Sequence, residues 1–95
     1  MIVRLVKLTF LPDFSEEFYR IYVEKESRIA SWPGCSGVKL YQDVNHPAIY
    51  FTWSLWESEA HLNDYRHSAF FQETWAVVKK HFAAPPEARN LCQRS

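Results

Sequence analysis

Features that mark several large classes of protein are missing from this sequence. It has only two glycines, so it contains no glycine-rich loop to cradle a phosphate, and its serines lie outside any nucleophile-elbow motif. Its two cysteines, Cys35 and Cys92, have neither CxxC spacing nor a flanking histidine at ligand distance, so no zinc site or redox pair is indicated. Two cysteines are also too few for a disulfide scaffold, so we expect free thiols.

No charge of one sign predominates. Eleven Lys and Arg balance eleven Asp and Glu without forming a basic stripe, so the electrostatic surface of a nucleic-acid binder is missing. The apolar start, residues 1–11, is interrupted by Arg4 and Lys7, is too short to span a membrane and lacks a small-residue cleavage site. The histidines form no ligand pair with a carboxylate. We therefore expect a cytoplasmic protein that binds no nucleic acid, membrane or metal.

Aromatic residues are abundant instead. Four Trp, five Tyr and seven Phe in 95 residues exceed what a structural core of this length needs, because such side chains dominate cores and interfaces. A chain this short also buries only about 60 to 65% of its unfolded surface, which favours association. We expect some of the aromatic residues to line a cavity or a contact between subunits.

The first half of the chain predicts a strand, a helix and a hairpin. The opening strand is apolar on both parities, as in a strand that is covered on both faces. Asp13 begins a capping-box-like pattern, and the helix that follows stops at Trp32-Pro33-Gly34. A turn-forming segment with Asn and Pro then joins two strands. These elements are predicted at residues 2–11 (strand), 13–31 (helix), 38–42 and 49–56 (strands).

The second half predicts two helices and a final strand. Ser58 can cap a short helix after the aromatic strand, and a longer amphipathic helix reaches Phe82. Pro85-Pro86 separates that helix from residues 87–95, which can form a strand or an arm. The order βαββαβ predicts a single α+β domain over residues 1–95, with the ferredoxin-like arrangement of an antiparallel sheet under helices.

The other face of such a sheet would remain uncovered. We assign Val3, Leu5, Val38, Leu40 and one of Phe51 and Thr52 to it. So many apolar side chains cannot all remain in water, and a second sheet in a symmetric homodimer would cover them. The sequence therefore predicts a homodimer.

Several segments together carry a family resemblance. They are the strand IVRLVKLTF, the helix end SWPGC, the junction FTWSLWESEA, the segment YRHSAFF and the closing pattern W-x6-F-AAPPEA. Over roughly residues 1–88 the chain resembles the antibiotic biosynthesis monooxygenase-like (ABM) family of dimeric α+β barrels. The strand-end Trp56, followed by an acidic and a small residue, is the most specific part of the match.

The resemblance implies a homodimer of ferredoxin-like subunits, each with a pocket between helices and sheet. It also implies oxidation of a quinol or phenolic aromatic by oxygen without a metal, flavin or other cofactor. Where many members carry histidines, however, this chain has Tyr65 and Phe70. A non-catalytic dimer that holds a small apolar or aromatic ligand in the same cavity is therefore the alternative.

Three residues are the candidates for catalysis. Tyr65 occupies a functional position of the relatives, and its hydroxyl can donate a hydrogen bond or a proton to a phenol or carbonyl. His67 as a base, or Lys7 as a cation that stabilises a phenolate, would handle charge. Each has a plainer alternative: Tyr65 as packing at a helix junction, His67 as a solvated side chain, and Lys7 as half of a surface ion pair.

Aromatic residues are expected to form the walls of the substrate pocket. Trp53 and Trp56 point to opposite faces of one strand, so only one of them can face a given cavity. Trp75 lies on the core stripe of its helix, where packing alone also explains it. Arg66 could bind an anionic group on a ligand, although an exposed helix residue needs no such role. The predicted pocket residues are Trp53, Trp56, Arg66, Phe71 and Trp75.

Overall fold

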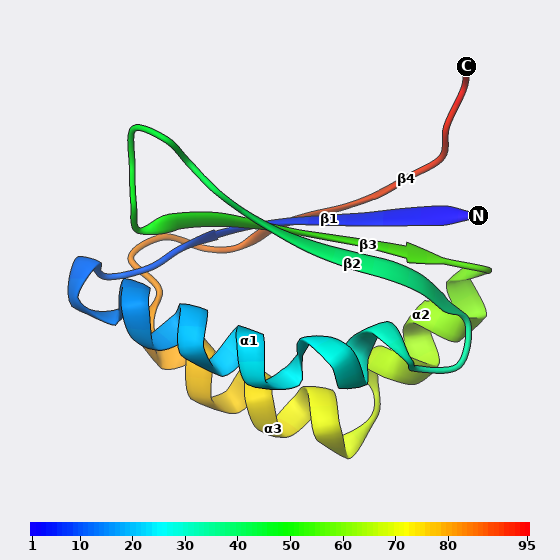
Figure 1. Ribbon diagram of the computed structural model, residues 1–95, viewed down its shortest axis with the longest axis horizontal. Helices are drawn as coiled ribbons and strands as arrows, with labels where there is room; N and C mark the ends of the chain where they lie inside the picture. The colour runs from blue at the N-terminus through cyan, green and yellow to red at the C-terminus, as the bar shows by residue number, and fades with distance from the viewer.

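The computed structural model describes residues 1–95 and places all helices on one face of a four-stranded antiparallel sheet (Figure 1). The predicted α+β, ferredoxin-like order βαββαβ is confirmed, with the second helical segment divided in two. None of the helices combines the length and apolar character needed to cross a membrane. The elements are β1 (Ile2–Thr9), α1 (Ser15–Ala30), β2 (Cys35–Gln42), β3 (Ile49–Trp56), α2 (Glu59–Arg66), α3 (Ala69–Val78) and β4 (Glu87–Leu91), with short 3-10 helices at Pro12–Phe14 and Lys79–His81.

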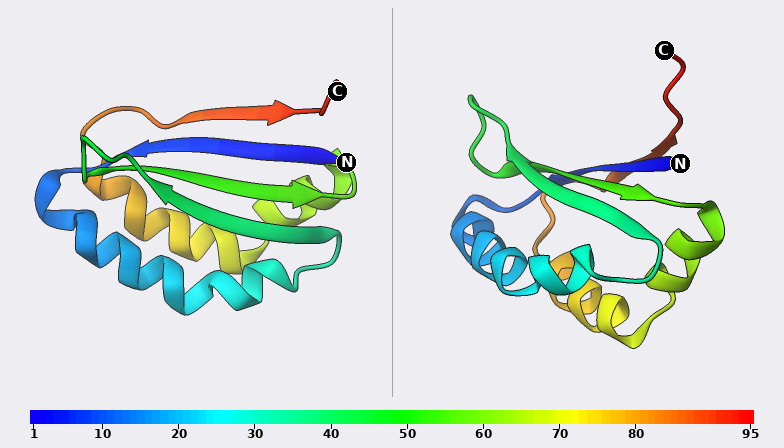
Figure 2. Two further views of the ribbon diagram at one scale, coloured as in Figure 1. Left: turned by 45° about the horizontal axis from the view of Figure 1, so that its top comes forward. Right: turned by 45° about the vertical axis from the view of Figure 1, so that its right-hand side comes forward.

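β1 is central to the sheet, whose strand order is β2-β3-β1-β4 (Figure 2). It pairs with β3 along its full length, from Ile2 opposite Trp56 to Thr9 opposite Ile49. On its other side it pairs with β4. The segment after Pro86, predicted as a strand or an arm, is therefore an edge strand over Glu87–Leu91.

The pleat of β1 divides its residues between two environments. Leu8 and Phe10 are buried beneath the helices. Because side chains alternate along a strand, Val6 and Arg4 share that covered face. Val3, Leu5 and Lys7 lie on the helix-free face.

The prediction that Val38 and Leu40 lie on the helix-free face is wrong. Leu40 packs against the core cluster, and Val38 lines a cavity under the helices. Their β3 partners are Thr52 and Ser54, which share the parity of the fully buried Trp56. A register shift between Cys35 and Gly37 accompanies this pairing, so alternation counted from the sequence alone does not identify the face.

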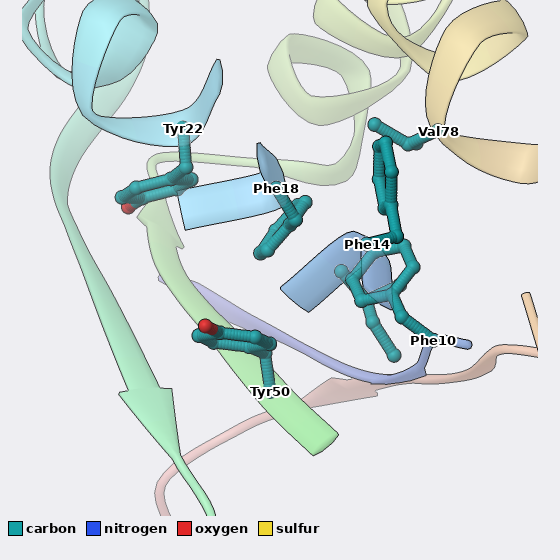
Figure 3. Close-up of a cluster of buried hydrophobic side chains, with 7 residues drawn as sticks. Phe10, Phe14, Phe18, Tyr22, Tyr50 and Val78 are labelled. Atoms are coloured by element: carbon teal, nitrogen blue, oxygen red, sulfur yellow. The ribbon is translucent and has the colours of Figure 1, made fainter. Parts of the chain in front are cut away.

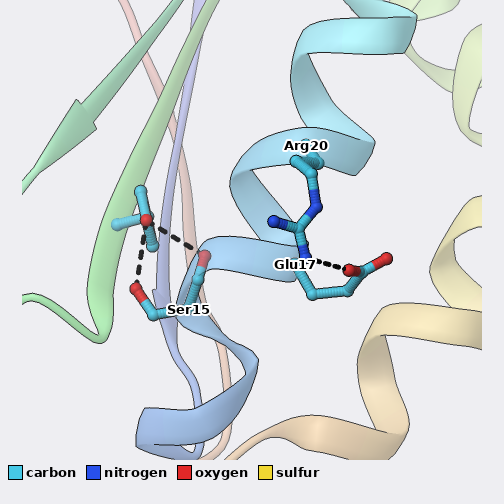
Figure 4. Close-up of polar contacts among 4 residues, drawn as sticks. Ser15, Glu17 and Arg20 are labelled. Carbon is cyan, nitrogen blue, oxygen red and sulfur yellow. Dashed lines mark hydrogen bonds and ion pairs between the residues drawn. The ribbon is translucent and has the colours of Figure 1, made fainter.

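The predicted cap at Asp13 is also wrong, whereas the cap at Ser58 is confirmed. The residue before α1 is Phe14, and no side chain caps that helix. Ser15 Oγ instead donates to Pro47 O at 2.7 Å and lies 3.1 Å from the hydroxyl of Tyr50. This helix end is therefore bonded to β3 and the turn before it rather than capped locally, and Figure 4 shows Ser15 with its dashed contacts at the start of the helix. Ser58 Oγ accepts the His61 N–H at 3.2 Å and begins α2.

The core lies between α1, α3 and the sheet and consists mainly of aromatic rings (Figure 3). Phe10 is at its centre with 1% of its surface exposed. Its ring centroid lies 4.5 Å from that of Phe18 and 5.2 Å from that of Phe82. Because its ring is buried and packs against rings from the helical layer, Phe10 joins the end of β1 to the helices.

Replacing Phe10 by Ala should therefore lower the free energy of unfolding by about 3–5 kcal/mol, because it removes a buried ring and leaves a cavity. Urea unfolding followed by circular dichroism measures this change. Tyr19→Ala is the matched control, since Tyr19 is 49% exposed on α1 and should change stability by less than about 1 kcal/mol. Equal losses in the two variants would contradict the central position of Phe10.

Candidate functional site

A cavity of about 490 Å³ lies between the sheet and the three helices. Fourteen of its 23 lining residues are hydrophobic, and its volume is in the range of sites for small molecules. The sheet contributes Arg4, Val6 and Thr52, and the helices contribute Tyr22, Tyr65 and Trp75 among others. The cavity can therefore hold a mainly apolar ligand beside a few polar groups.

Tyr65, in the last turn of α2, is held by aromatic rings on several sides. It stacks on Trp56 with ring centroids 5.1 Å apart, and it meets Phe71 and Trp32 edge-on at 5.2 Å and 5.5 Å. Trp56 has no exposed surface, and its indole N–H donates to Ser54 Oγ at 2.9 Å. The Tyr65 ring is therefore fixed in one position against the sheet.

The turn before β2 contributes to this arrangement. Gly34 has φ of +84°, and a Cβ atom at this position would overlap the ring of His61 on α2. Glu57 N–H donates to Gly34 O at 2.8 Å, which joins the turn to the end of β3. This close approach brings Trp32 against Tyr65.

The hydroxyl of Tyr22 is fully buried and makes no hydrogen bond of good geometry, although the Glu26 carboxylate lies near enough to raise its pKa. Burial raises the pKa of Tyr65, with the neighbouring Cys35 thiol as a smaller cause. Burial, followed by the charge of Glu26, likewise raises the pKa of Tyr22. Both side chains therefore stay neutral at physiological pH and can donate a hydrogen bond to a ligand.

His67 lies at the exposed rim of the cavity, directly after α2. Its Nδ1 is 2.7 Å from the carbonyl oxygen of Asn63. Because a carbonyl only accepts, Nδ1 must carry the proton, which leaves the lone pair of the neutral ring on Nε2. His67 is thus oriented with one nitrogen free to accept a proton.

Three permanent cations line the cavity: Arg4, Lys25 and Arg66. The Arg4 guanidinium donates to Asn90 Oδ1 at 2.9 Å, and Lys25 Nζ lies 5.2 Å from the ring centroid of Phe70. Burial, and then the charge of Arg66, lower the pKa of Arg4. Arginine remains charged in proteins, so the two guanidiniums repel each other across this site.

Six of the eight predicted site residues line the cavity, and their roles remain predictions. They are Trp53, Tyr65, Arg66, His67, Phe71 and Trp75. Phe71 and Trp75 stack with ring centroids 5.8 Å apart and planes 12° apart. These two rings form a flat aromatic wall.

Lys7 does not line the cavity, which corrects its predicted place beside a substrate. It lies on the helix-free face, where its Nζ is 3.8 Å from a Glu87 carboxylate oxygen. The plainer alternative, a surface ion pair, describes its position. The cation that β1 directs into the cavity is Arg4.

Of the two tryptophans of β3, only Trp53 is among the residues that line the cavity. Trp56 lies behind Tyr65 and does not line the cavity. The strand at Trp53 forms part of the cavity wall, but alternation with Thr52 and Ser54 directs its indole to the helix-free face. There Lys39 Nζ lies 5.0 Å from its ring centroid.

The sequence prediction missed Arg4, Tyr22 and Lys25 as cavity residues. No sequence signal separates Arg4 from Lys7, because the apolar residues of β1 lie on both parities. No group of three or more His, Cys, Asp or Glu side chains is placed to hold a metal ion. Cys35 and Cys92 are free thiols, as expected.

Comparisons with known proteins agree with this fold. The family model described as antibiotic biosynthesis monooxygenase matches residues 1–77, and no curated protein matches the chain. A candidate antibiotic biosynthesis monooxygenase from Nitrosomonas europaea is similar with a TM-score of 0.91 at 15% identity, with 100% of both chains covered. One from Bordetella bronchiseptica has a TM-score of 0.83 at 27% identity, covering 97% of this chain and 95% of that one. One from Caulobacter crescentus has a TM-score of 0.86 at 21% identity, covering 95% of this chain and 86% of that one.

Tyr65 should contribute to a loss of stability at alkaline pH. Its folded-state pKa is raised above the usual 10.0, so its contribution is complete below pH 10.0 and is lost as pH rises towards the folded-state pKa. Above pH 10.0 the free energy of unfolding of Tyr65→Phe should therefore fall less steeply with pH than that of the wild type, by up to about 1.4 kcal/mol per pH unit. Urea unfolding over a pH series measures both slopes. Identical slopes would show that the Tyr65 phenol is not protected from ionisation.

Proposed function

This chain belongs to the antibiotic biosynthesis monooxygenase family, and on that premise we propose that its cavity is an active site in which oxygen oxidises a small aromatic quinol or phenol without metal or flavin. The observation that carries the proposal is the position of Tyr65 and His67 on one apolar cavity. Tyr65 offers a neutral hydroxyl donor, and the neutral tautomer of His67 that fits its bond to Asn63 has its lone pair on Nε2. A donor and a base beside an apolar wall suit proton removal from a phenolic substrate.

The proposed reaction needs no reductant other than the substrate. A base removes a proton from the keto or enol form, and the carbanion-like anion passes one electron to oxygen. The radical pair joins through a new carbon–oxygen bond, and the peroxide formed takes the proton back. The oxygen–oxygen bond of the hydroperoxide then breaks. Its outer OH group leaves as water together with the second hydrogen of the same carbon, and a carbonyl remains. One oxygen atom ends in the product and the other in water.

The residues of the cavity would act by position and electrostatics. His67 Nε2 would accept and return the proton, while the Tyr65 hydroxyl would donate to the substrate oxygen on which negative charge develops. The guanidiniums of Arg4 and Arg66 would stabilise the same charge. The stacked rings of Phe71 and Trp75 would orient the substrate and keep water from the radical pair.

Oxygen uptake by metal-free protein with a panel of hydroquinones and anthrone-like aromatics tests this reaction. We expect protein-dependent uptake, with Tyr65→Phe and His67→Gln each lowering kcat/KM about a hundredfold by removing a donor and a base. Tyr19→Phe and His46→Gln are matched controls, because both side chains are exposed and lie outside the cavity. Uptake that both site variants retain would contradict the assigned roles.

The second candidate function is that of a non-catalytic dimer that holds a small aromatic ligand. It is favoured by Tyr65 and Phe70 at positions where many relatives carry histidines. The two candidates differ in turnover. Saturable quenching of tryptophan fluorescence by panel members, without oxygen uptake from any of them, would support the binding protein and contradict the oxygenase.

In both cases we propose that the protein acts as a homodimer joined through the helix-free face of the sheet. Apolar side chains from all four strands lie on this face, which no part of the chain covers. A second copy would bury the same surface on both subunits, as two-fold symmetry requires. The apolar residues of this face are Val3, Leu5, Tyr41, Ile49, Phe51, Trp53, Leu55 and Leu91.

Leu5→Glu should convert this dimer into a monomer, because the two copies would each bury an unpaired charge at the contact. Sedimentation at micromolar concentration measures the mass. Val23→Glu places the same charge on an exposed apolar residue of α1 and should leave the mass of a dimer unchanged. A wild-type chain that sediments as a monomer would contradict the proposed contact.

A further inference from the structure

We propose that the ligand of this cavity is an aromatic carboxylate, with its carboxylate group between Arg4 and Arg66 and its ring against the aromatic wall. This inference rests on the proposed use of the cavity as a ligand site and specifies the class of ligand.

The charge of the lining is one-sided. Arg4, Lys25 and Arg66 all line the cavity, and none of its 23 lining residues is Asp or Glu. The ion pairs of the molecule lie elsewhere, at Lys7–Glu87, Arg20–Glu17 and His61–Glu57. Charges withdrawn from water are normally paired with an opposite charge. The cations of this cavity have no such partner among the lining residues, so a bound anion could supply it.

Arg66 is the clearest unpaired donor. Its Nε is buried and has no hydrogen-bond partner, which is uncommon for a polar atom in a folded protein. Arg4 bonds only the neutral side-chain amide of Asn90, which leaves its charge uncompensated. Because the charge of Arg66 lowers the pKa of Arg4, the two guanidiniums are close enough to repel, and an anion between them would remove that repulsion.

Two phenolic hydroxyls add donors on the same cavity. Tyr22 Oη is the other buried polar side-chain atom without a hydrogen bond of good geometry, with the Glu26 carboxylate nearby, and Tyr65 lines the same cavity. Lys25 is engaged over the ring of Phe70, which leaves the two arginines as the available cations. Guanidinium forks and hydroxyl donors match the oxygen atoms of a planar anion.

The apolar and aromatic lining of the cavity favours one class of anion over others. Hydrophobic residues dominate the lining, so the ligand must be mainly apolar, and a monoanion costs less to remove from water than a phosphate dianion. The stacked pair Phe71 and Trp75 favours a flat aromatic body over an aliphatic chain. An aromatic ring with one carboxylate satisfies both conditions.

Calorimetric titration with 2-naphthoate and its uncharged analogue 2-naphthamide tests the inference. We expect the wild type to bind 2-naphthoate at least about tenfold more tightly than 2-naphthamide, because only the carboxylate forms charge-assisted hydrogen bonds with the arginines. Arg66→Met and Arg4→Met should reduce this ratio to near one while changing the affinity for the amide less than about threefold. Arg66→Lys, which keeps the charge but loses the fork, should give an intermediate ratio.

Arg20→Met is the matched control, since Arg20 is exposed, lies outside the cavity and should retain the full ratio. Equal affinity for the two probes, or a ratio that the arginine variants leave unchanged, would overturn the inference. Tighter binding of 2-naphthyl phosphate than of 2-naphthoate would overturn the choice of carboxylate.

Oxygen uptake separates this inference from the proposed function. Arginine-dependent preference for the carboxylate in a protein that consumes no oxygen would support the ligand class and contradict the oxygenase. Protein-dependent oxidation of neutral quinols, with no preference between naphthoate and naphthamide, would support the oxygenase and overturn the ligand class.

Discussion

The alternation of side chains along β1 is the constraint on which the rest of the structure depends. This strand lies at the centre of the sheet, and its even-numbered residues face the helices. Phe10 and Leu8 form the core with α1 and α3, while Arg4, farther along the same row, reaches the cavity. One row of side chains thus leads from the most apolar part of the molecule to its most positively charged cavity wall.

The site itself depends on packing between segments that are distant in the sequence. Tyr65 is positioned by Trp56 from β3, by Trp32 from the turn before β2 and by Phe71 from α3. The close approach of Gly34 to α2 makes this meeting possible. The polar groups are therefore carried on rigid aromatic supports, and their geometry does not rely on long flexible side chains.

Sequence patterns predicted the order of elements well because hydrophobic periodicity and turn residues are local signals. The strand at residues 49–56 and the cap at Ser58 agree with the structure. The cap at Asp13 failed because Ser15 is bonded to a segment more than thirty residues away. Arg4 was overlooked in favour of Lys7 because β1 is apolar on both parities, so composition does not tell which face the helices cover.

The two roles of β1 limit the substitutions that this strand can tolerate. Its even-numbered side chains serve the core and the cavity, and its odd-numbered ones form the face proposed to meet a second subunit. Such a strand has no neutral position, since a change at any residue disturbs one layer or the other. β4 pairs on one edge only and is exposed along its length in the single chain, so it contributes less to the core than β1, although Ala88 lines the cavity and Leu91 lies on the proposed contact face. Mutational tolerance should therefore rise between two neighbouring strands of the same sheet.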